Sequence, residues 1–188
     1  WMWGINYVGN LGTGNTTSTS TPVQVGTDTN WKEVRCGYSF THALKTDGTL
    51  WAFGSNYTGQ LGDGTTVNKS SPIQIGSLTN WKKVSVGYSC SYAIKTDGTL
   101  WGCGYTGSSE AGYNNFGTLG NGVNIGSYSS PIQVGNLTNW KQVACGYRYT
   151  AAIKTDGTLW TWGVNNLGQL GNNTVTIKYS SPVQVGSL

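Results

Sequence analysis

The chain has 188 residues with 9 Trp, 11 Tyr and 29 Gly, and only 10% of its residues are charged. Its net charge of +4 comes from 11 basic residues that do not cluster on one element, which argues against a nucleic-acid-binding surface. No apolar run is long enough to cross a membrane and no window shows helical periodicity, so we expect an all-β chain without membrane insertion.

Near-copies of one segment set the architecture. The sequence K-T-D-G-T-L-W occurs at 45–51, 95–101 and 154–160, and a Pro that precedes another shared segment recurs at intervals of 50, 59 and 51 residues, at Pro22, Pro72, Pro131 and Pro182. A period near 50 residues is typical of propeller blades. We expect one domain, 1–188, with about 3.7 repeats at approximately 1–50, 51–100, 101–159 and 160–188.

Each repeat contains four runs of strand length bounded by Gly, Asn, Asp or Pro. In one copy they cover residues 71–76, 81–87, 92–96 and 99–101. Four short strands per repeat predict a blade of a β-propeller.

The pair Asp97-Gly98 joins the last two of these strands. An Asp-Gly pair predicts a two-residue hairpin loop, because Gly takes positive φ without strain. With that loop, Ile94 lies opposite Trp101 and Tyr92 lies opposite Cys103. Each copy of the segment is therefore expected to be a hairpin turn rather than an active motif.

The fourth strand leads into a segment rich in Gly and Asn, at 4–14, 54–64 and 163–173. This density predicts a tight loop that packs close to neighbouring backbone, with Leu61 and its counterparts as apolar anchors. No helix and no Lys-Ser/Thr pair follow it, so a phosphate-binding loop is not expected.

Recurring polar and sulfur residues are also expected to be structural. Six Lys occupy matching repeat positions and are expected on solvated strand edges and turn flanks: Lys32, Lys82, Lys141, Lys45, Lys95 and Lys154. The 4 Cys and the single His form no metal-binding pattern. Cys36 and Cys145 share a repeat position and are expected to be buried, and a disulfide between Cys90 and Cys103 could form but is not favoured.

The sequence contains no catalytic constellation. Asp47, Asp97 and Asp156 are expected in hairpin turns, and the remaining acids cannot be paired with one another or with His42. The nine Trp fall at recurring positions and are expected to pack within blades. We therefore expect neither an enzyme nor a cofactor or metal site.

Two sets of residues depart from the repeat. Nine extra residues enlarge the third repeat, 101–159, mostly between Trp101 and Leu119, and offer Tyr105, Glu110, Tyr113, Asn114, Asn115 and Phe116. This insertion is either a tolerated surface loop or a specific contact. The second set lies at or beside strand positions that differ between blades, where variation reflects drift or a binding face: Arg35, His42, Tyr92, Arg148 and Tyr149.

The linked motifs W-x-x-G-x-N-x-x-G-Q-L-G, S-P-x-Q-V-G, W-K-x-V-x-x-G-Y and A-I-K-T-D-G-T-L-W resemble the regulator of chromosome condensation repeat family over essentially the whole chain. The resemblance implies a seven-bladed β-propeller, of which this chain supplies about half. It is similar to the bacterial, environmental or viral branch, and it has Phe40, Cys90 and Tyr149 where the family commonly places a histidine. A lone half-ring exposes unpaired backbone groups at its edges, so it is expected to be marginally stable or to associate with other molecules.

We expect a non-catalytic binding or structural module at a bacterial cell surface, a virion surface or another extracellular site, which contacts a protein or a glycan. The alternative is an intracellular regulator that binds a small GTPase or chromatin, as the family's nucleotide-exchange members do. The ring is expected to close either through the remainder of a longer chain or through a second copy.

Overall fold

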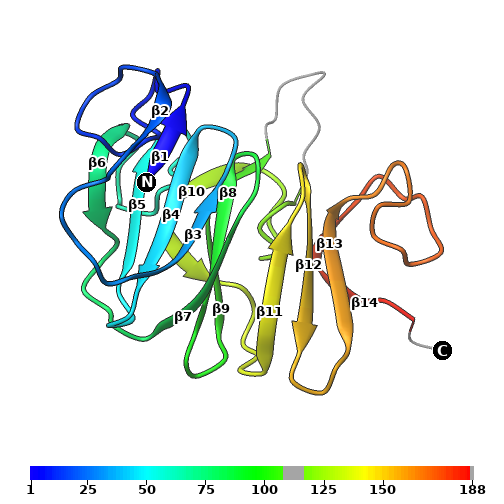
Figure 1. The fold of residues 1–188 in the computed structure, drawn as a ribbon. Helices are drawn as coiled ribbons and strands as arrows, with labels where there is room; N and C mark the ends of the chain where they lie inside the picture. Colours follow the sequence, from blue (N-terminus) through cyan, green and yellow to red (C-terminus); the bar gives the residue numbers. More distant parts are fainter. Residues whose placement is uncertain (108–116, 187–188) are drawn as a thin grey trace.

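The computed structural model describes residues 1–107 and 117–186 (Figure 1). These residues form fourteen strands in three four-stranded antiparallel sheets and one two-stranded ribbon. None of the described residues belongs to a helix of the length and apolarity needed to span a membrane. The all-β prediction and the four-stranded blade are thus confirmed.

The strands are bounded as follows: β1 Met2–Gly4, β2 Thr19–Val23, β3 Trp31–Cys36, β4 Phe40–Lys45, β5 Leu50–Gly54, β6 Lys69–Gln74, β7 Trp81–Val86, β8 Cys90–Lys95, β9 Leu100–Gly107, β10 Gly126–Gln133, β11 Trp140–Cys145, β12 Tyr149–Lys154, β13 Leu159–Val164 and β14 Lys178–Gln184.

The three complete sheets are blades that meet along their first strands. Their orders are β3-β4-β5-β6, β7-β8-β9-β10 and β11-β12-β13-β14, and β7 lies against both β3 and β11. The backbone N–H of Cys145 in β11 donates a hydrogen bond to Ser85 Oγ in β7 at 3.1 Å. The last strand of each blade lies farthest from this inner row, as in a propeller sector (Figure 1).

The blades do not coincide with the sequence units predicted above. The sheets span 31–74, 81–133 and 140–184, so the predicted limits near 50, 100 and 159 fall inside sheets, at the start of their third strands. The β1–β2 ribbon has the positions of the two outer strands of a further blade. The described chain therefore contains three and a half blades.

The hairpin register differs by one residue from the prediction. Ile94 lies opposite Leu100 and Tyr92 opposite Gly102. The reason is a three-residue loop: Lys95 N–H donates to Thr99 O at 3.0 Å, Gly98 N–H donates to Lys95 O at 3.0 Å, and Gly98 has a φ of 78°. A turn closed by a left-handed Gly also uses Asp-Gly, so the dipeptide did not distinguish the two loop lengths.

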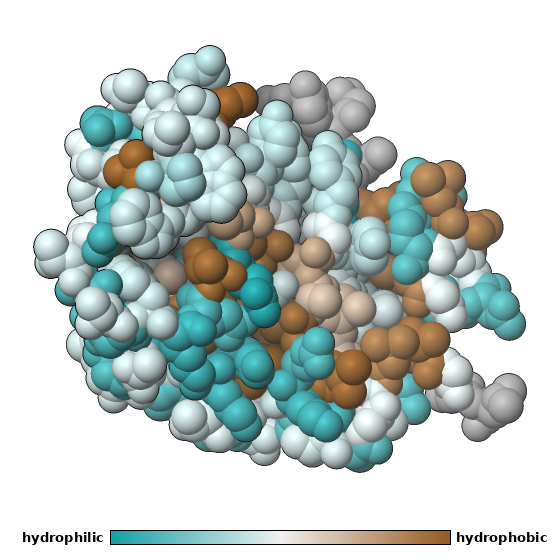
Figure 2. Space-filling model, viewed as in Figure 1, coloured by the Kyte–Doolittle hydropathy of each residue, from teal (hydrophilic) through white to brown (hydrophobic). Residues whose placement is uncertain are grey.

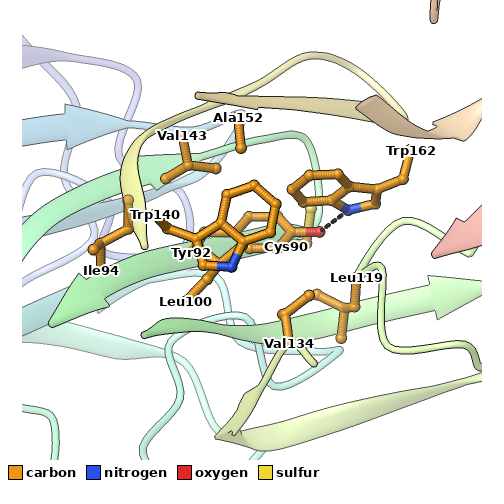
Figure 3. Close-up of a cluster of buried hydrophobic side chains, with 10 residues drawn as sticks. All are labelled: Cys90, Tyr92, Ile94, Leu100, Leu119, Val134, Trp140, Val143, Ala152 and Trp162. Carbon is orange, nitrogen blue, oxygen red and sulfur yellow. Dashed lines mark hydrogen bonds between the residues drawn. The ribbon is translucent and has the colours of Figure 1, made fainter. Parts of the chain in front are cut away.

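Apolar side chains fill the spaces between successive blades. One cluster includes Phe40, Leu44 and Leu61 and joins the β3–β6 blade to Trp81 and its neighbours. The next joins the β7–β10 blade to the β11–β14 blade (Figure 3). There the Trp162 indole N–H lies 3.1 Å from the Tyr92 hydroxyl oxygen and 3.0 Å from the Thr118 carbonyl oxygen, and the Tyr92 hydroxyl donates to Thr118 O.

The glycine-rich loops that are followed by another blade pack against its backbone, in line with the predicted close packing. The buried Asn56 organises this loop: its Oδ1 accepts from Leu61 N–H at 3.0 Å and its Nδ2 donates to Thr65 O at 3.0 Å. Gly59 lies so close to the β10 backbone that a Cβ there would be 2.5 Å from the Ser129 Cα. Gly64 N–H then donates to Ser129 O at 2.7 Å, which fastens the loop to the next blade.

Two predictions about buried residues are wrong. Lys45, Lys95 and Lys154 are buried rather than solvated, because each ammonium group lies over two Trp rings. Cys36 is exposed at the inner edge of β3, and Cys145 is half-buried. All four Cys are free thiols, so Cys90 and Cys103 do not form a disulfide.

The Trp prediction holds only in part. Trp81, Trp140 and Trp162 are buried between blades, whereas Trp1 and Trp3 are exposed at the end of the chain where β1 and β2 lack an inner pair of strands. The repeat position is the same for Trp1 and Trp101, but Trp101 packs against Trp81 and Lys95 on the inner strands of its own sheet, which the β1–β2 ribbon lacks.

Candidate functional site

A row of three tyrosines lies where the inner two strands of each blade connect. Tyr38, Tyr88 and Tyr147 occupy the turns between β3 and β4, β7 and β8, and β11 and β12. The Tyr38 and Tyr88 ring centroids are 4.6 Å apart, and those of Tyr88 and Tyr147 are 4.7 Å apart. We call these three residues the tyrosine row.

The sequence G-Y before the second strand builds this row. Each turn closes through a backbone hydrogen bond of 2.8 Å, such as Gly87 N–H to Cys90 O. The Gly allows neighbouring turns to approach, since a Cβ on Gly37 would be 2.9 Å from Gly87 O and one on Gly87 would be 3.0 Å from Gly146 O. This close approach brings successive Tyr rings into contact.

The row is accessible to solvent and continues into a basic residue. Tyr38 is 73% exposed and Tyr147 is 58% exposed. The Arg148 guanidinium carbon lies 4.7 Å from the Tyr147 ring centroid. Single exposed aromatics are common, but three in contact with an adjoining guanidinium form a surface of the composition found in the centres of protein interfaces.

Two hollows adjoin the row, and they bring three predicted site residues together. Tyr105 and Arg148 line a hollow of about 50 Å³ beside Tyr88. Arg148 and Tyr149 line a second hollow of about 230 Å³ that extends toward β13. Tyr105 is held at this surface because its N–H donates to Ser89 O at 2.9 Å.

The other predicted residues lie elsewhere. His42 and Tyr92 are buried between blades, so their side chains are not part of an exposed face. Arg35 lies on the inner strand β3 and forms a 2.7 Å ion pair with Glu33. The remaining candidates lie outside the described residues: Glu110, Tyr113, Asn114, Asn115 and Phe116.

The insertion nevertheless begins and ends at the side of the molecule that carries the row. β9 extends to Gly107, past the point where the matching strand β5 ends, and Tyr105 pairs with the Ser89 turn. Thr118 Oγ1 donates to Tyr105 O at 2.6 Å. The excess residues are therefore attached beside the Tyr88 turn.

The sequence predictions do not include the tyrosine row, since the recurring aromatics that they consider are the nine Trp. The useful signal was local: G-Y-S or G-Y-R separates two strand runs, and a turn between antiparallel strands lies at the end of a sheet. A recurring aromatic in such a turn reaches the surface in each blade, whereas strand residues such as Trp81, Trp140 and Trp162 are buried between blades.

The row offers stacking surfaces and hydroxyl groups rather than reactive groups. Among residues 1–107 and 117–186, no group of three or more His, Cys, Asp and Glu residues could hold a metal ion. Burial raises the pKa of Cys103 and of Cys145 to about 12, so these thiols are not activated nucleophiles. Cys90, beneath the 50 Å³ hollow, has its pKa raised for the same reason.

Comparison with known proteins follows the repeat pattern. The family model described as "Regulator of chromosome condensation (RCC1) repeat" matches residues 1–44, 47–94, 97–153 and 156–188. A second model of the same description matches 31–60 and 140–169.

Relatives match over part of their length. The Ultraviolet-B receptor UVR8 of Arabidopsis thaliana is 37% identical over 78 residues, which are 39% of this chain and 17% of the receptor. The probable E3 ubiquitin-protein ligase HERC6 of Homo sapiens is 36% identical over 81 residues, which are 41% of this chain and 8% of the ligase.

Solved structures share the fold. Human WBSCR16 superposes with a TM-score of 0.81 at 22% identity, over 98% of this chain and 46% of that one. Yeast RCC1 (Prp20), in a structure with Kap60, superposes with a TM-score of 0.78 at 19% identity, over 97% and 43%. The chain thus spans less than half the length of each of these proteins.

Proposed function

The chain belongs to the regulator of chromosome condensation repeat family, and from that premise we propose that it is a non-catalytic module that binds a protein on its tyrosine row. The observation that carries this proposal is the contact between three Tyr rings at spacings of 4.6 and 4.7 Å, continued by Arg148. The two outer rings are exposed and the middle ring, Tyr88, is half-buried between them. Tyr and Arg are the residues in which interface energy concentrates.

A protein partner fits the row better than a small molecule. The rings lie on the surface, and the hollows beside them are shallow, about 50 and 230 Å³. Small-molecule sites are usually deeper and enclose most of the ligand. A row that crosses three blades instead suits an extended partner surface, with the hollows as places for single side chains.

Other functions predicted from the sequence stay predictions. The low charge and the Thr-, Asn- and Ser-rich composition support a module at an extracellular, cell or virion surface. The family relationship supports the alternative of a regulator that binds a small GTPase or chromatin. Closure of the ring by a longer chain or by a second copy also stays a prediction, as does the bacterial or viral branch.

The test compares two sets of Tyr substitutions. The row variant changes Tyr38, Tyr88 and Tyr147 to Ala, and the matched control changes the isolated exposed Tyr7 and Tyr57 to Ala. Partners captured by the wild-type protein are purified, and their dissociation constants for all three proteins are measured by calorimetry. We expect the row variant to weaken binding about 100-fold or more, as loss of interface anchors does, while the control binds as the wild type does.

Equal binding by the row variant and the wild type would contradict the proposal. A glycan array and a nucleotide-release assay on a small GTPase use the same three proteins. If glycan binding is lost in the row variant, the ligand of the tyrosine row is a glycan rather than a protein. Accelerated nucleotide release would favour the intracellular regulator.

A further inference from the structure

A second site lies at the opposite ends of the same strands, where a lysine ammonium group faces two indole rings. In β8, Cys90 lies beside the tyrosine row and Lys95 lies at the other end. Lys95 Nζ is 3.7 Å from the Trp101 ring centroid and 5.0 Å from the Trp81 ring centroid. Lys45 and Lys154 repeat this arrangement in the neighbouring blades.

One of the three copies shows what the arrangement binds. Lys45 Nζ donates to the Asp28 carboxylate at 2.7 Å while it remains 3.8 Å from the Trp51 ring centroid. Asp28 comes from the loop between β2 and β3. The repeat geometry therefore accepts a carboxylate on the ammonium group without loss of the stacking contact.

The other two copies lack that carboxylate. The positions that match Asp28 are Leu78 and Leu137, in the loops before β7 and β11. Within the described residues, no acidic side chain forms an ion pair with Lys95 or Lys154. The nearby Asp97 forms no ion pair with Lys95 and is held by Thr99, because its Oδ1 accepts from Thr99 N–H at 2.9 Å and from Thr99 Oγ1 at 2.7 Å.

Lys95 also faces open space. A hollow of about 340 Å³ is lined by Lys95, Trp81 and Trp101, with Leu78 at its rim and Asp63 among its other lining residues. Asp63 is neutralised by Lys69 at 3.2 Å and accepts from Thr65 N–H at 3.0 Å. Lys95 is only 8% exposed, so little of its side chain contacts water. Its ammonium group also has no carboxylate partner in the described chain.

We propose that the Lys95–Trp81–Trp101 hollow is a docking site for a carboxylate carried by an acidic side chain of a partner protein. The ligand carboxylate accepts hydrogen bonds from Lys95 Nζ in the place that Asp28 takes on Lys45. The indole faces hold the ammonium group in position and shield it from water, which strengthens a charge-assisted hydrogen bond. This site is separate from the tyrosine row and does not depend on it.

The binding experiment uses short capped peptides and the indole N–H resonances of the intact 188-residue protein. The probes are acetyl-Gly-Asp-Gly-amide, its Asn counterpart and sodium acetate. We expect the Asp peptide to shift the Trp81 and Trp101 resonances saturably, with a dissociation constant on the order of tens of millimolar for a single charge-assisted hydrogen bond. The Asn peptide is expected to shift neither resonance.

Two variants use the chain's own repeats as controls. Leu78→Asp, at an exposed position, places the missing carboxylate within the chain. It is expected to raise the dissociation constant of the Asp peptide at least tenfold, to roughly that for an unrelated surface. Asp28→Leu opens the Lys45 copy and is expected to add shifts at Trp31 and Trp51. Lys95→Met is expected to abolish the Trp81 and Trp101 shifts, and its near-ultraviolet circular dichroism reports whether it folds.

Each outcome decides the proposal. Shifts at Trp81 and Trp101 that vanish in Leu78→Asp support it. Absence of shifts with the Asp peptide and acetate, or equal shifts at Trp31 and Trp51 in the wild type, where Asp28 already fills the copy, would overturn it. A response to acetate but not to the peptide would show that the hollow binds a carboxylate and would overturn the proposal that an acidic protein side chain supplies it. If Lys95→Met does not fold, Leu78→Asp and Asp28→Leu still decide the question.

Discussion

His42 is enclosed between blades, where its Nε2 donates to Gln60 O at 3.1 Å and its ring lies edge-on to Phe40. Its Nδ1 is buried and has no partner among the described residues. Burial disfavours the imidazolium form, so the pKa of His42 falls from 6.5 to about 4. The folded protein therefore holds a neutral histidine well below the pH at which the unfolded chain is protonated.

This depressed pKa predicts an acid-sensitive fold. Above the unfolded pKa of 6.5 both states are neutral and His42 does not alter stability, whereas between 6.5 and about 4 only the unfolded state binds the proton, so the folded state is progressively destabilised. Between about pH 7 and pH 5, the wild type is expected to lose about 2 kcal/mol of unfolding free energy from this residue.

His42→Gln retains an amide that can reach Gln60 O but cannot titrate. Urea denaturation at both pH values measures the difference between this variant and the wild type. The variant is expected to lose less unfolding free energy between pH 7 and pH 5 than the wild type does. An equal loss in both proteins would show that His42 is not the source of the acid sensitivity. Phe40 and Leu44 contact the same region and do not titrate, so they leave the comparison unaffected.

The surroundings of individual side chains were harder to predict from the sequence than the strands and loops. The sequence places Lys95 at a strand end beside a turn, which is typical of solvent exposure. The burial of Lys95, in β8, depends on Trp81 in β7 and Trp101 in β9. Their rings surround the ammonium group only after the sheet has formed. The tyrosine row similarly requires three turns from three blades.

At the scale of the element, the glycine-rich loop gives a matched pair of positions. Gly59 and Gly168 occupy the same place in two copies, with φ values of 75° and 76°. A Cβ on Gly59 would be 2.5 Å from the Ser129 Cα of the next blade, whereas a Cβ on Gly168 would meet nothing within 4 Å. The two positions therefore differ in the neighbouring blade and not in backbone conformation.

Gly59→Ala is expected to destabilise the protein by about 3 kcal/mol, because it combines backbone strain with a clash against backbone. Gly168→Ala carries only the strain and is expected to cost about 1 kcal/mol. Chemical denaturation monitored by Trp fluorescence measures both. Equal costs would mean that the loop is not fastened to the next blade as the Gly59 contact implies.

Strands and loops were largely predictable because their signals are local. The four strand runs, the Gly-Asn loop and its anchor Leu61 were recognised from alternation and turn residues. The hairpin register was not, because Asp97-Gly98 suits both a two-residue loop and the observed three-residue loop. A one-residue change moves Tyr92 from Cys103 to Gly102, which leaves room for its ring.

At the scale of the whole molecule, the two outermost blades expose surfaces that are covered elsewhere. Leu159 is 40% exposed, although its counterpart Leu100 is fully buried, and Val34 is 50% exposed where Val84 is 3% exposed. Figure 2 shows hydrophobic residues gathered over the β11–β14 blade and the loop that follows β13. Apolar surfaces of this kind promote association.

Leu159→Glu is expected to reduce self-association of the 188-residue chain and to change its unfolding free energy by less than about 1 kcal/mol. Leu100→Glu places a charge between two blades and is expected to cost on the order of 4 kcal/mol. Sedimentation velocity measures association, and circular dichroism measures folding. If Leu159→Glu unfolds the chain as Leu100→Glu does, the β11–β14 blade is covered in solution by something other than solvent.

The contact between Gly59 and Ser129 has a consequence for how such a chain can lengthen. The donor loop and the acceptor strand both belong to the repeat, so every copy of the repeat carries one half of the joint at each side. A tandem duplication of the coding segment would add a blade whose connections on both sides are already specified. New length would then require no newly evolved interface, and substitutions could accumulate in the exposed turns while the joints stayed the same.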